Sequence, residues 1–284
     1  MQKSIGILYI CTGPYVVFWK DFFDTFEKNF LPDLQKNYYV FTDQEEIYAE
    51  DCGRVKRYNL APQPWPLVTL LRFHTFLTIK EELEKEDYLM FSNANMICDQ
   101  TVSKEEFLPR IELGELLAFT KHPGYCNVPI YKAPLDRNKH CKAYVPYDCG
   151  TDYVIGAMFN GTSKAFLKMC EVLRERINDD LKRNVIARWH DESHINRYII
   201  NKPECRILSP SYCYPFGIEL PIEKKISAVD KQSKFDVKGF KGQNNTQSDN
   251  NLMRKMKNIG IKILRNEKNY LFIDKIFGKK IEKI

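Results

Sequence analysis

The stretch Asp87–Met96, DYLMFSNANM, decides the fold that we expect. Residues 88–92 form an unbroken apolar and aromatic run of high β-propensity, which predicts a short buried strand. The run stops at Asn93-Ala94-Asn95, three residues that neither continue a strand ladder nor pack a core. Because ligands of open α/β sheets bind beyond the carboxyl ends of the strands, this polar triplet is a candidate binding site.

Around this stretch the chain alternates predicted strands with predicted helices. Further strands are expected at 4–10, 38–42, 116–120, 154–159 and 206–209, and helices at 15–30, 67–84, 163–183 (capped by Ser163) and 191–200. Turn residues follow the first strand at 12–14, and a proline-rich loop occupies 59–66. Such alternation predicts an α/β fold with a largely parallel sheet and right-handed crossovers.

Size and composition bound the class of protein. The 284 residues are 44% hydrophobic and 28% charged, enough to bury a full core. No apolar run approaches the roughly 20 residues that a membrane-spanning helix needs. The nine cysteines are scattered and form no CxxC pair, which favours neither a disulfide framework nor a zinc ribbon. We therefore expect a cytoplasmic protein.

The net charge of +6 is unevenly distributed. Residues 251–284 carry ten basic and three acidic side chains, so this part has a charge of +7 and the remainder −1. We expect a polar linker at 241–251 and a basic tail with interleaved apolar residues at 252–284. The tail suggests a rival class, a membrane-surface or nucleic-acid binding protein. The near-neutral remainder argues against a nucleic-acid groove, which leaves peripheral contact with the inner membrane face as a role for the tail alone.

The densest cluster of chemically useful side chains is WHDESH, residues 189–194. His190 and His194 are four residues apart and could face one metal ion from a helix, but the zinc-protease pattern requires Glu directly after the first His, where Asp191 stands. A charged helix start at the surface is a second interpretation. The third is a sugar site, in which a Trp ring stacks on a pyranose and a carboxylate faces the anomeric carbon.

Other features are ambiguous when each is taken alone. Two asparagines after a strand are common turn formers, and their amides can bind a ribose hydroxyl or a phosphate but bring no charge for Mg²⁺ or Mn²⁺. Arg72 lies among apolar residues of its predicted helix, where it either extends to the surface or binds phosphate. The residues at 122–125 could form only a turn, and Lys231 could be merely solvated.

Taken in order, these features and several short phrases resemble glycosyltransferase family 6. The family contains the mammalian histo-blood-group A and B transferases, the α1,3-galactosyltransferase and shorter bacterial members. The lack of both aspartates of the family's metal motif makes this chain most similar to bacterial, metal-independent members. The phrases, which span about residues 5–240, are YYVFTDQ (38–44), Asn-Ala-Asn (93–95), HPG (122–124), AYVP (143–146), WHDESHINRY (189–198), LSPSY (208–212) and SAVDK (227–231).

The resemblance implies a single GT-A domain at 1–240, with a Rossmann-like, mostly parallel sheet flanked by helices and a closing segment at about 222–240. The implied reaction moves GalNAc or Gal from a UDP-sugar to the 3-hydroxyl of a β-galactoside with retention of the α configuration. We expect UDP-GalNAc as donor, with UDP-Gal as the alternative, and a Fucα1-2Gal acceptor that yields an A-antigen-like product. We expect no cofactor and no metal ion.

The resemblance also assigns roles to individual residues. Glu192 matches the proposed nucleophile, and Asp191 matches a residue that holds the donor sugar. The implied UDP contacts are Ile10, Thr12, Tyr15, Arg72, Asn93, Ala94, Asn95 and Lys231, the stretch that selects between Gal and GalNAc is Ile155, Gly156 and Ala157, and the acceptor contacts are His122 and Trp189. Two acceptor contacts of the mammalian enzymes cannot be transferred, because Pro134 and Pro215 occupy their positions.

Overall fold

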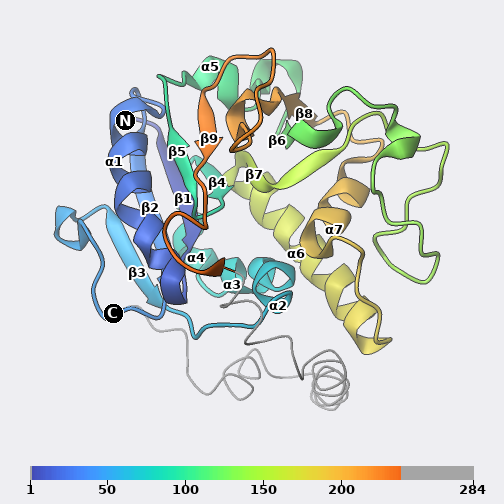
Figure 1. Ribbon diagram of the computed structural model, residues 1–284, viewed down its shortest axis with the longest axis horizontal. Coiled ribbons are helices and arrows are strands. Elements are labelled where there is room, and N and C mark those ends of the chain that lie inside the picture. The colour runs from blue at the N-terminus through green and yellow to red at the C-terminus, as the bar shows by residue number, and fades with distance from the viewer. Residues whose placement is uncertain (1, 238–284) are drawn as a thin grey trace.

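The computed structural model describes residues 2–237 (Figure 1). The predicted linker at 241–251 and the predicted basic tail at 252–284 lie outside the described residues, as do the last residues of the predicted closing segment. Within residues 2–237, no helix is both long and apolar enough to cross a membrane.

A seven-stranded sheet forms the centre of the molecule, in the order β3-β2-β1-β4-β7-β6-β8. The predicted buried strand at 88–92 is its fourth strand in this order, and every residue of that strand is buried. Pairing is parallel except where β7 joins β4 and β6, so the predicted α/β fold with a mostly parallel sheet is confirmed. The strands are β1 (Ser4–Ile10), β2 (Gln35–Thr42), β3 (Val55–Asn59), β4 (Tyr88–Ser92), β6 (Leu117–Lys121), β7 (Val154–Thr162) and β8 (Cys205–Leu208).

Helices cover both faces of the sheet (Figure 1). Because side chains of a strand alternate between faces, β1 sends Tyr9 against Trp19 and Phe22 of α1, whereas Leu8 joins the core on the opposite face. That second core includes residues of α3, α6 and α7. The helices are α1 (Trp19–Asn29), α2 (Leu67–Leu70), α3 (Arg72–Leu77), α4 (Lys80–Leu83), α5 (Lys104–Phe107), α6 (Ser163–Lys182) and α7 (His190–Ile199).

The strand order places a switch point at β1, which pairs with β2 on one side and with β4 on the other. Ligands of open α/β sheets bind in the crevice that such a point creates beyond the carboxyl ends of the strands. The loop after β4 is tied to β1 there, since the Tyr9 hydroxyl of β1 donates a hydrogen bond to the Ala94 carbonyl over 2.8 Å. The turn after β1 requires glycine, because Gly13 has a φ of 58° while its N–H donates to Asp43.

Two predicted helices are wrong in detail. The segment 15–30 is a 3-10 turn (Gly13–Phe18) followed by α1, and the segment 67–84 is divided into α2, α3 and α4. Threonine hydroxyls bond to backbone carbonyls in the second segment: Thr69 to Pro66 over 2.9 Å and Thr78 to Thr75 over 2.6 Å. Such bonds compete with the backbone hydrogen bonds of a helix. They favour the division of this segment, which apolar spacing alone cannot predict.

Three strands were not predicted. The first is β3, whose last residue, Asn59, falls at the start of the predicted loop. The other two, β5 (Met96–Cys98) and β9 (Ile226–Ala228), pair with each other in a separate antiparallel sheet. These strands are short, and β9 lies in the segment predicted to close over the site. The predicted cap of α6 is also wrong: Thr162 accepts the capping hydrogen bond from Ala165, and the Ser163 hydroxyl donates to Leu83.

Candidate active site

Two carboxylates lie in the first turn of α7, the helix predicted from the WHDESH cluster. The helix begins at His190, whose φ of 50° is unusual for a residue with a side chain. Asp191 is 4% exposed and packs against β7. A Cβ atom at Gly156 would lie 3.1 Å from Asp191 Oδ2 and 3.2 Å from Glu192 Cβ, so glycine permits this close approach of strand and helix.

Arg72 of α3 is the cation beside these carboxylates. Its Nε lies 3.2 Å from Asp191 Oδ2, and its Nη1 donates to the Gly156 carbonyl over 2.7 Å. The guanidinium also stacks over Phe91 of β4, 4.2 Å from the ring centroid. The side chain is only 6% exposed, so its extension to the surface is excluded, and Arg72 faces the carboxylates.

Glu192 is held through both carboxylate oxygens. The Tyr153 hydroxyl donates to Oε1 over 2.5 Å, and the Gly156 N–H donates to Oε2 over 2.8 Å. Tyr153 and Gly156 both belong to the chain at or entering β7, so one strand fixes the orientation of this carboxylate. An amide clamp supports the arrangement, because the Asn196 side chain on α7 bonds to both backbone groups of Val154.

Burial dominates the electrostatics of this cluster. It raises the pKa of Asp191 to about 7, although the positive charge of Arg72 acts in the opposite direction. Burial also raises the pKa of Glu192, against the lowering effect of the hydrogen bonds from Gly156 and Tyr153. Asp191 Oδ2 is buried and has no hydrogen-bond partner among the described residues. A ligand hydroxyl could supply that donor if the packing around this buried atom opened to admit it.

The Asn-Ala-Asn triplet lies beyond β4, as predicted, and joins two neighbouring segments. The Asn93 N–H donates to the Ala157 carbonyl, and the Asn95 side chain donates to the Val229 carbonyl, each over 2.8 Å. The resemblance implies that aspartates at these positions would hold a divalent cation through charged oxygens. Here both side chains are neutral amides, so they bring no charge to such an ion.

Two predicted UDP contacts from opposite ends of the described chain lie together. The Lys231 ammonium is 5.6 Å from the centroid of the Tyr15 ring. Phe235 packs on the same ring with a centroid distance of 5.2 Å, and Lys234 forms an ion pair with Asp21 of α1. The segment after β9 therefore folds back onto the turn that follows β1.

The remaining predicted site residues lie on the same sheet edge or beside it. Ile10 ends β1 and Thr12 follows it, whereas Ile155 and Ala157 flank Gly156 within β7. His122 follows β6, where burial lowers its pKa to about 4, and its ring lies 5.5 Å from that of Tyr153. Trp189 is 44% exposed just before α7, as a ring that stacks on a sugar requires.

Two residues of the cluster were not predicted from the sequence. Tyr153 is a single aromatic residue before a predicted strand, and Asn196 is one polar residue in a predicted helix. Tyr153 carries no local signal that distinguishes it from ordinary core residues, whereas Asn196 lies within the phrase at 189–198 that carries the resemblance but was given no role. The predicted alternative of a zinc pair at His190 and His194 is not supported, because the His190 ring packs on Trp65 whereas His194 faces Asp180.

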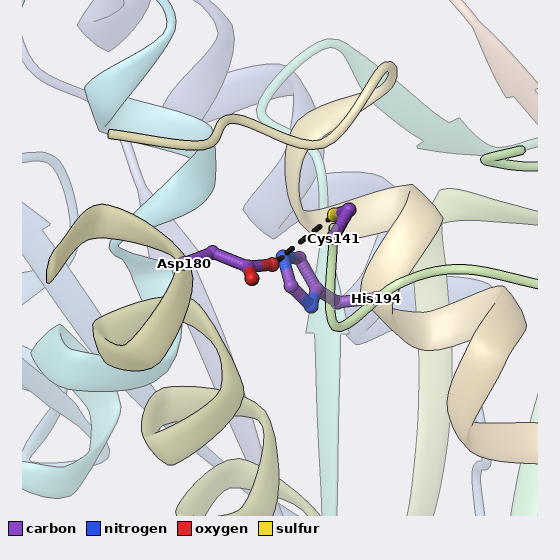
Figure 2. Close-up of side chains that lie close together, drawn as sticks. All are labelled: Cys141, Asp180 and His194. Atoms are coloured by element: carbon purple, nitrogen blue, oxygen red, sulfur yellow. Dashed lines mark hydrogen bonds and ion pairs between the residues drawn. The ribbon is translucent and has the colours of Figure 1, made fainter. Parts of the chain in front are cut away.

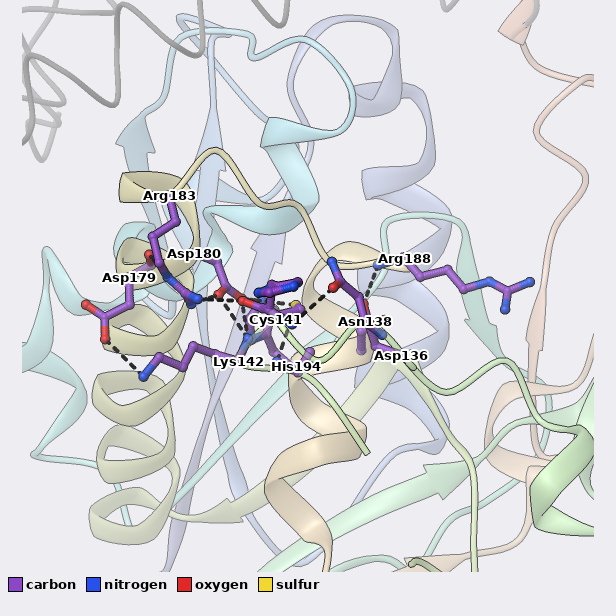
Figure 3. A network of polar contacts seen from close by, with 12 residues as sticks. Asp136, Asn138, Cys141, Lys142, Asp179, Asp180, Arg183, Arg188 and His194 are labelled. Carbon is purple, nitrogen blue, oxygen red and sulfur yellow. Dashed lines mark hydrogen bonds and ion pairs between the residues drawn. The ribbon is translucent and has the colours of Figure 1, made fainter. Parts of the chain in front are cut away.

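A second buried cluster, which we call the buried hub, consists of Cys141, Asp180 and His194 (Figure 2). The Cys141 thiol donates to Asp180 over 3.1 Å, and the Lys142 N–H donates to both Asp180 oxygens over 2.9 Å. Arg183 completes the shell of donors around this carboxylate (Figure 3). The hub thus joins the end of α6, the loop before β7 and α7.

The buried hub has ligand types that metal ions use, and their atoms lie within 4.8 Å of one another. The oxygens of Asp180, however, already accept hydrogen bonds from Cys141, Lys142 and Arg183. Three ligands also leave a tetrahedral zinc site one short among the described residues. Burial raises the pKa of the thiol well above its usual range, which keeps its proton on sulfur. We therefore interpret the hub as a structural hydrogen-bond network.

Comparison with known proteins agrees with this geometry. The sequence model of glycosyltransferase family 6 matches residues 1–238. The O-antigen biosynthesis glycosyltransferase WbnI of Escherichia coli is 34% identical over 80% of this chain and 95% of its own length. The globoside α-1,3-N-acetylgalactosaminyltransferase 1 of Gallus gallus is 28% identical over 81% of this chain and 68% of its own. The histo-blood group ABO system transferase 2 of Rattus norvegicus is 28% identical over 75% of this chain and 64% of its own length.

The mostly parallel sheet, its switch point at β1 and the carboxylates beside it define a glycosyltransferase domain of the GT-A type. Because the family model matches residues 1–238, which is most of the chain, the protein belongs to glycosyltransferase family 6. The predicted family and fold are therefore confirmed.

Proposed function

We propose that this chain is a retaining α1,3-N-acetylgalactosaminyltransferase, which moves GalNAc from UDP-GalNAc to the 3-hydroxyl of a fucosylated β-galactoside. The observation that carries the proposal is the cluster on α7 and β7. Glu192 is fixed through both oxygens, and beside it lies the Asp191–Arg72 ion pair, in which a buried Asp191 oxygen lacks a hydrogen-bond donor within residues 2–237. A sugar hydroxyl bound to Asp191 would bring the anomeric carbon near Glu192.

Glu192 would act on the anomeric carbon from the face opposite the leaving UDP. A covalent glycosyl–enzyme and stabilisation of an oxocarbenium-like state are both consistent with a fixed carboxylate at this position. In either case the carboxylate must be ionised, and the two donors on its oxygens favour the charged form over the neutral one.

Metal independence is part of the proposal. Departure of UDP develops negative charge on the β-phosphate, which a protein without a divalent cation must offset with fixed positive side chains. Lys231 is the first candidate, because its segment folds back onto Tyr15 beyond the end of β1. Arg72 contributes from the side of the carboxylates. The neutral amides at 93 and 95 support this assignment of charge.

The choice of donor rests on the relatives. Gly156 does not decide between the two donors, because the space beside it is already filled by Asp191 and Glu192 of α7. Relatives from Gallus gallus and Homo sapiens are named N-acetylgalactosaminyltransferases, whereas another human relative is named alpha-1,3-galactosyltransferase 2. UDP-Gal is accordingly the second candidate donor.

One assay tests donor, acceptor and metal requirement. Transfer to 2′-fucosyllactose and to lactose is measured with UDP-GalNAc and UDP-Gal, each in excess EDTA and in Mn²⁺. We expect the highest kcat/KM for UDP-GalNAc with the fucosylated acceptor, with equal rates in EDTA and Mn²⁺. Activity that disappears in EDTA and returns with Mn²⁺ would refute metal independence, and faster transfer from UDP-Gal would select the second donor.

A further inference from the structure

Tyr153 joins the candidate nucleophile to the candidate acceptor side. The residue is 2% exposed and its hydroxyl donates to Glu192 Oε1 over 2.5 Å. Hydrogen bonds to a charged acceptor are shorter and stronger than neutral ones, as this distance illustrates. With Gly156 on the other oxygen, the carboxylate of Glu192 has a single defined orientation.

The phenol is suited to act as a permanent donor. Burial and the neighbouring charge of Glu192 raise the pKa of Tyr153 far above its usual range, so its proton stays on the oxygen throughout the working pH range. A donor of this kind stabilises the ionised carboxylate relative to the protonated one. It therefore opposes the burial that raises the pKa of Glu192.

Several other groups act on Glu192 from the elements around it. Arg72 of α3 favours its negative charge, whereas the charge of neighbouring Asp191 disfavours a second negative charge. Cys213 lies within electrostatic reach of Glu192 and of Lys231, but burial raises the pKa of its thiol to about 12, which leaves it neutral. Among these groups Tyr153 is the one that donates a side-chain hydrogen bond to the carboxylate.

The Tyr153 ring also packs against the turn after β6. The ring centroid of Tyr153 lies 5.5 Å from the ring centroid of His122 and 5.3 Å from that of Tyr125. The backbone carbonyl of Tyr153 accepts a hydrogen bond from the His122 N–H over 2.9 Å. The resemblance assigns acceptor binding to His122. An acceptor that displaces this turn would therefore also displace the phenol that holds Glu192.

We propose that Tyr153 is a positioning residue that orients the Glu192 carboxylate, keeps it ionised and couples it to the acceptor-side turn. This inference rests on the proposed function, in which Glu192 faces the anomeric carbon. It assigns a role to a residue that the sequence did not single out.

The test compares two variants that each remove one buried phenol-to-carboxylate hydrogen bond. Tyr153→Phe deletes the donor to Glu192, and Tyr39→Phe deletes a matched donor, since Tyr39 is 1% exposed and donates to Glu86 over 2.6 Å within the sheet. We expect Tyr153→Phe to lower kcat about 10- to 100-fold, with the KM for UDP-GalNAc changed less than about threefold. Because protonation of Glu192 becomes easier, the loss of kcat should grow as the pH falls from 8 to 5.5. Tyr39→Phe should show neither effect.

A second measurement covers the case in which Tyr153→Phe does not fold. Incorporation of 3-fluorotyrosine at position 153 retains the ring and makes the hydroxyl a stronger donor, so the kcat of this protein relative to the unmodified enzyme should rise as the pH falls. An unchanged kcat and pH profile in Tyr153→Phe, or in the fluorinated protein if that variant does not fold, would overturn the inference.

The reference variant Glu192→Gln separates failure of the inference from failure of the proposed function. If Glu192→Gln is inactive and Tyr153→Phe behaves as the unmodified enzyme, only the role of Tyr153 is refuted. If Glu192→Gln turns over normally, the proposed mechanism is refuted as well, and with it any role for Tyr153 that acts through Glu192.

Discussion

Two buried carboxylates near α7 have opposite surroundings. Asp191 forms an ion pair with Arg72, yet its Oδ2 atom lacks a hydrogen-bond donor among the described residues. Asp180 of the buried hub is also almost fully buried, but backbone, thiol and guanidinium donors surround its oxygens. Burial alone therefore does not separate a site residue from a structural one. What differs between these two carboxylates is the number of donors that already bond to their oxygens.

The pKa directions are alike for the two carboxylates, since burial raises the pKa of both Asp180 and Asp191. The difference lies in what protonation would do. A proton on Asp180 would displace a donor that is already present, whereas a proton on Asp191 could be replaced by a ligand hydroxyl. Substitutions in the buried hub should thus change stability, and those in the α7–β7 cluster should change activity.

The largest expected effect is on catalysis. Glu192→Gln retains the shape of the side chain but removes its charge, so we expect kcat for transfer to fall by about 10³-fold or more. UDP binding, measured by calorimetry, should change little because the substitution leaves Arg72 and the loop after β1 intact. The free energy of unfolding should change by less than about 1 kcal/mol. Turnover near that of the unmodified enzyme would remove Glu192 from the mechanism.

The corresponding experiment in the buried hub should give the reverse result. Asp180→Ala leaves the Lys142 N–H, the Cys141 thiol and Arg183 without their acceptor, so we expect a loss of about 3 kcal/mol in the free energy of unfolding. The matched control is Asp179→Ala, because the neighbouring carboxylate is 49% exposed and pairs only loosely with Lys142 over 3.6 Å.

For the control Asp179→Ala we expect the free energy of unfolding to change by less than about 0.5 kcal/mol. Urea unfolding measures both variants, and kcat at 20 °C should stay within a few-fold of the unmodified enzyme wherever the variant is folded. A loss of kcat comparable to that of Glu192→Gln, in a folded Asp180→Ala protein, would show that the hub also participates in catalysis.

Much of the α7–β7 cluster was predictable because its residues are adjacent in sequence or lie at strand ends. Asp191 and Glu192 stand together in one phrase, and the triplet at 93–95 follows a strand that apolar periodicity reveals. The mostly parallel sheet follows from the same periodicity. What the sequence could not supply was Tyr153, which is one tyrosine among sixteen and gains its role only through contacts with Glu192 of α7 and with the turn after β6.

The buried hub was missed as a cluster for a related reason, although His194 was considered as a metal ligand. Its three residues come from positions 141, 180 and 194, and no local spacing links them before the chain folds. The divided helix at 67–84 and the three-residue strand β9 were missed because side-chain hydrogen bonds and pairing between distant segments override local preference. Short-range pattern therefore predicts elements, whereas contacts between distant segments complete the site.

The smallest expected effects are on the pH dependence, and they again distinguish the two regions. Because burial raises the pKa of Asp191 to about 7, its ion pair with Arg72 is weakened below that pH. We expect kcat/KM for UDP-GalNAc to decrease about fivefold between pH 7 and pH 6 and to level off above pH 8. A profile that stays flat from pH 5.5 to 8 would refute this assignment to Asp191.

The free energy of unfolding should depend on pH in opposite directions at Asp191 and at His194. The folded-state pKa of Asp191 lies above its unfolded value, so the contribution of this group to stability is present below about pH 4 and is lost as the pH rises through about 7. Burial lowers the pKa of His194 to about 3, so its contribution to stability is present above about pH 6.5 and is lost as the pH falls toward 3.

Urea unfolding of two variants tests these directions. The free energy of unfolding of Asp191→Asn should show a gain relative to the unmodified protein that grows from pH 5 to pH 8. His194→Leu should instead show a gain that grows from pH 6.5 down to pH 5, and two variants with the same pH trend would contradict the separation of the two regions.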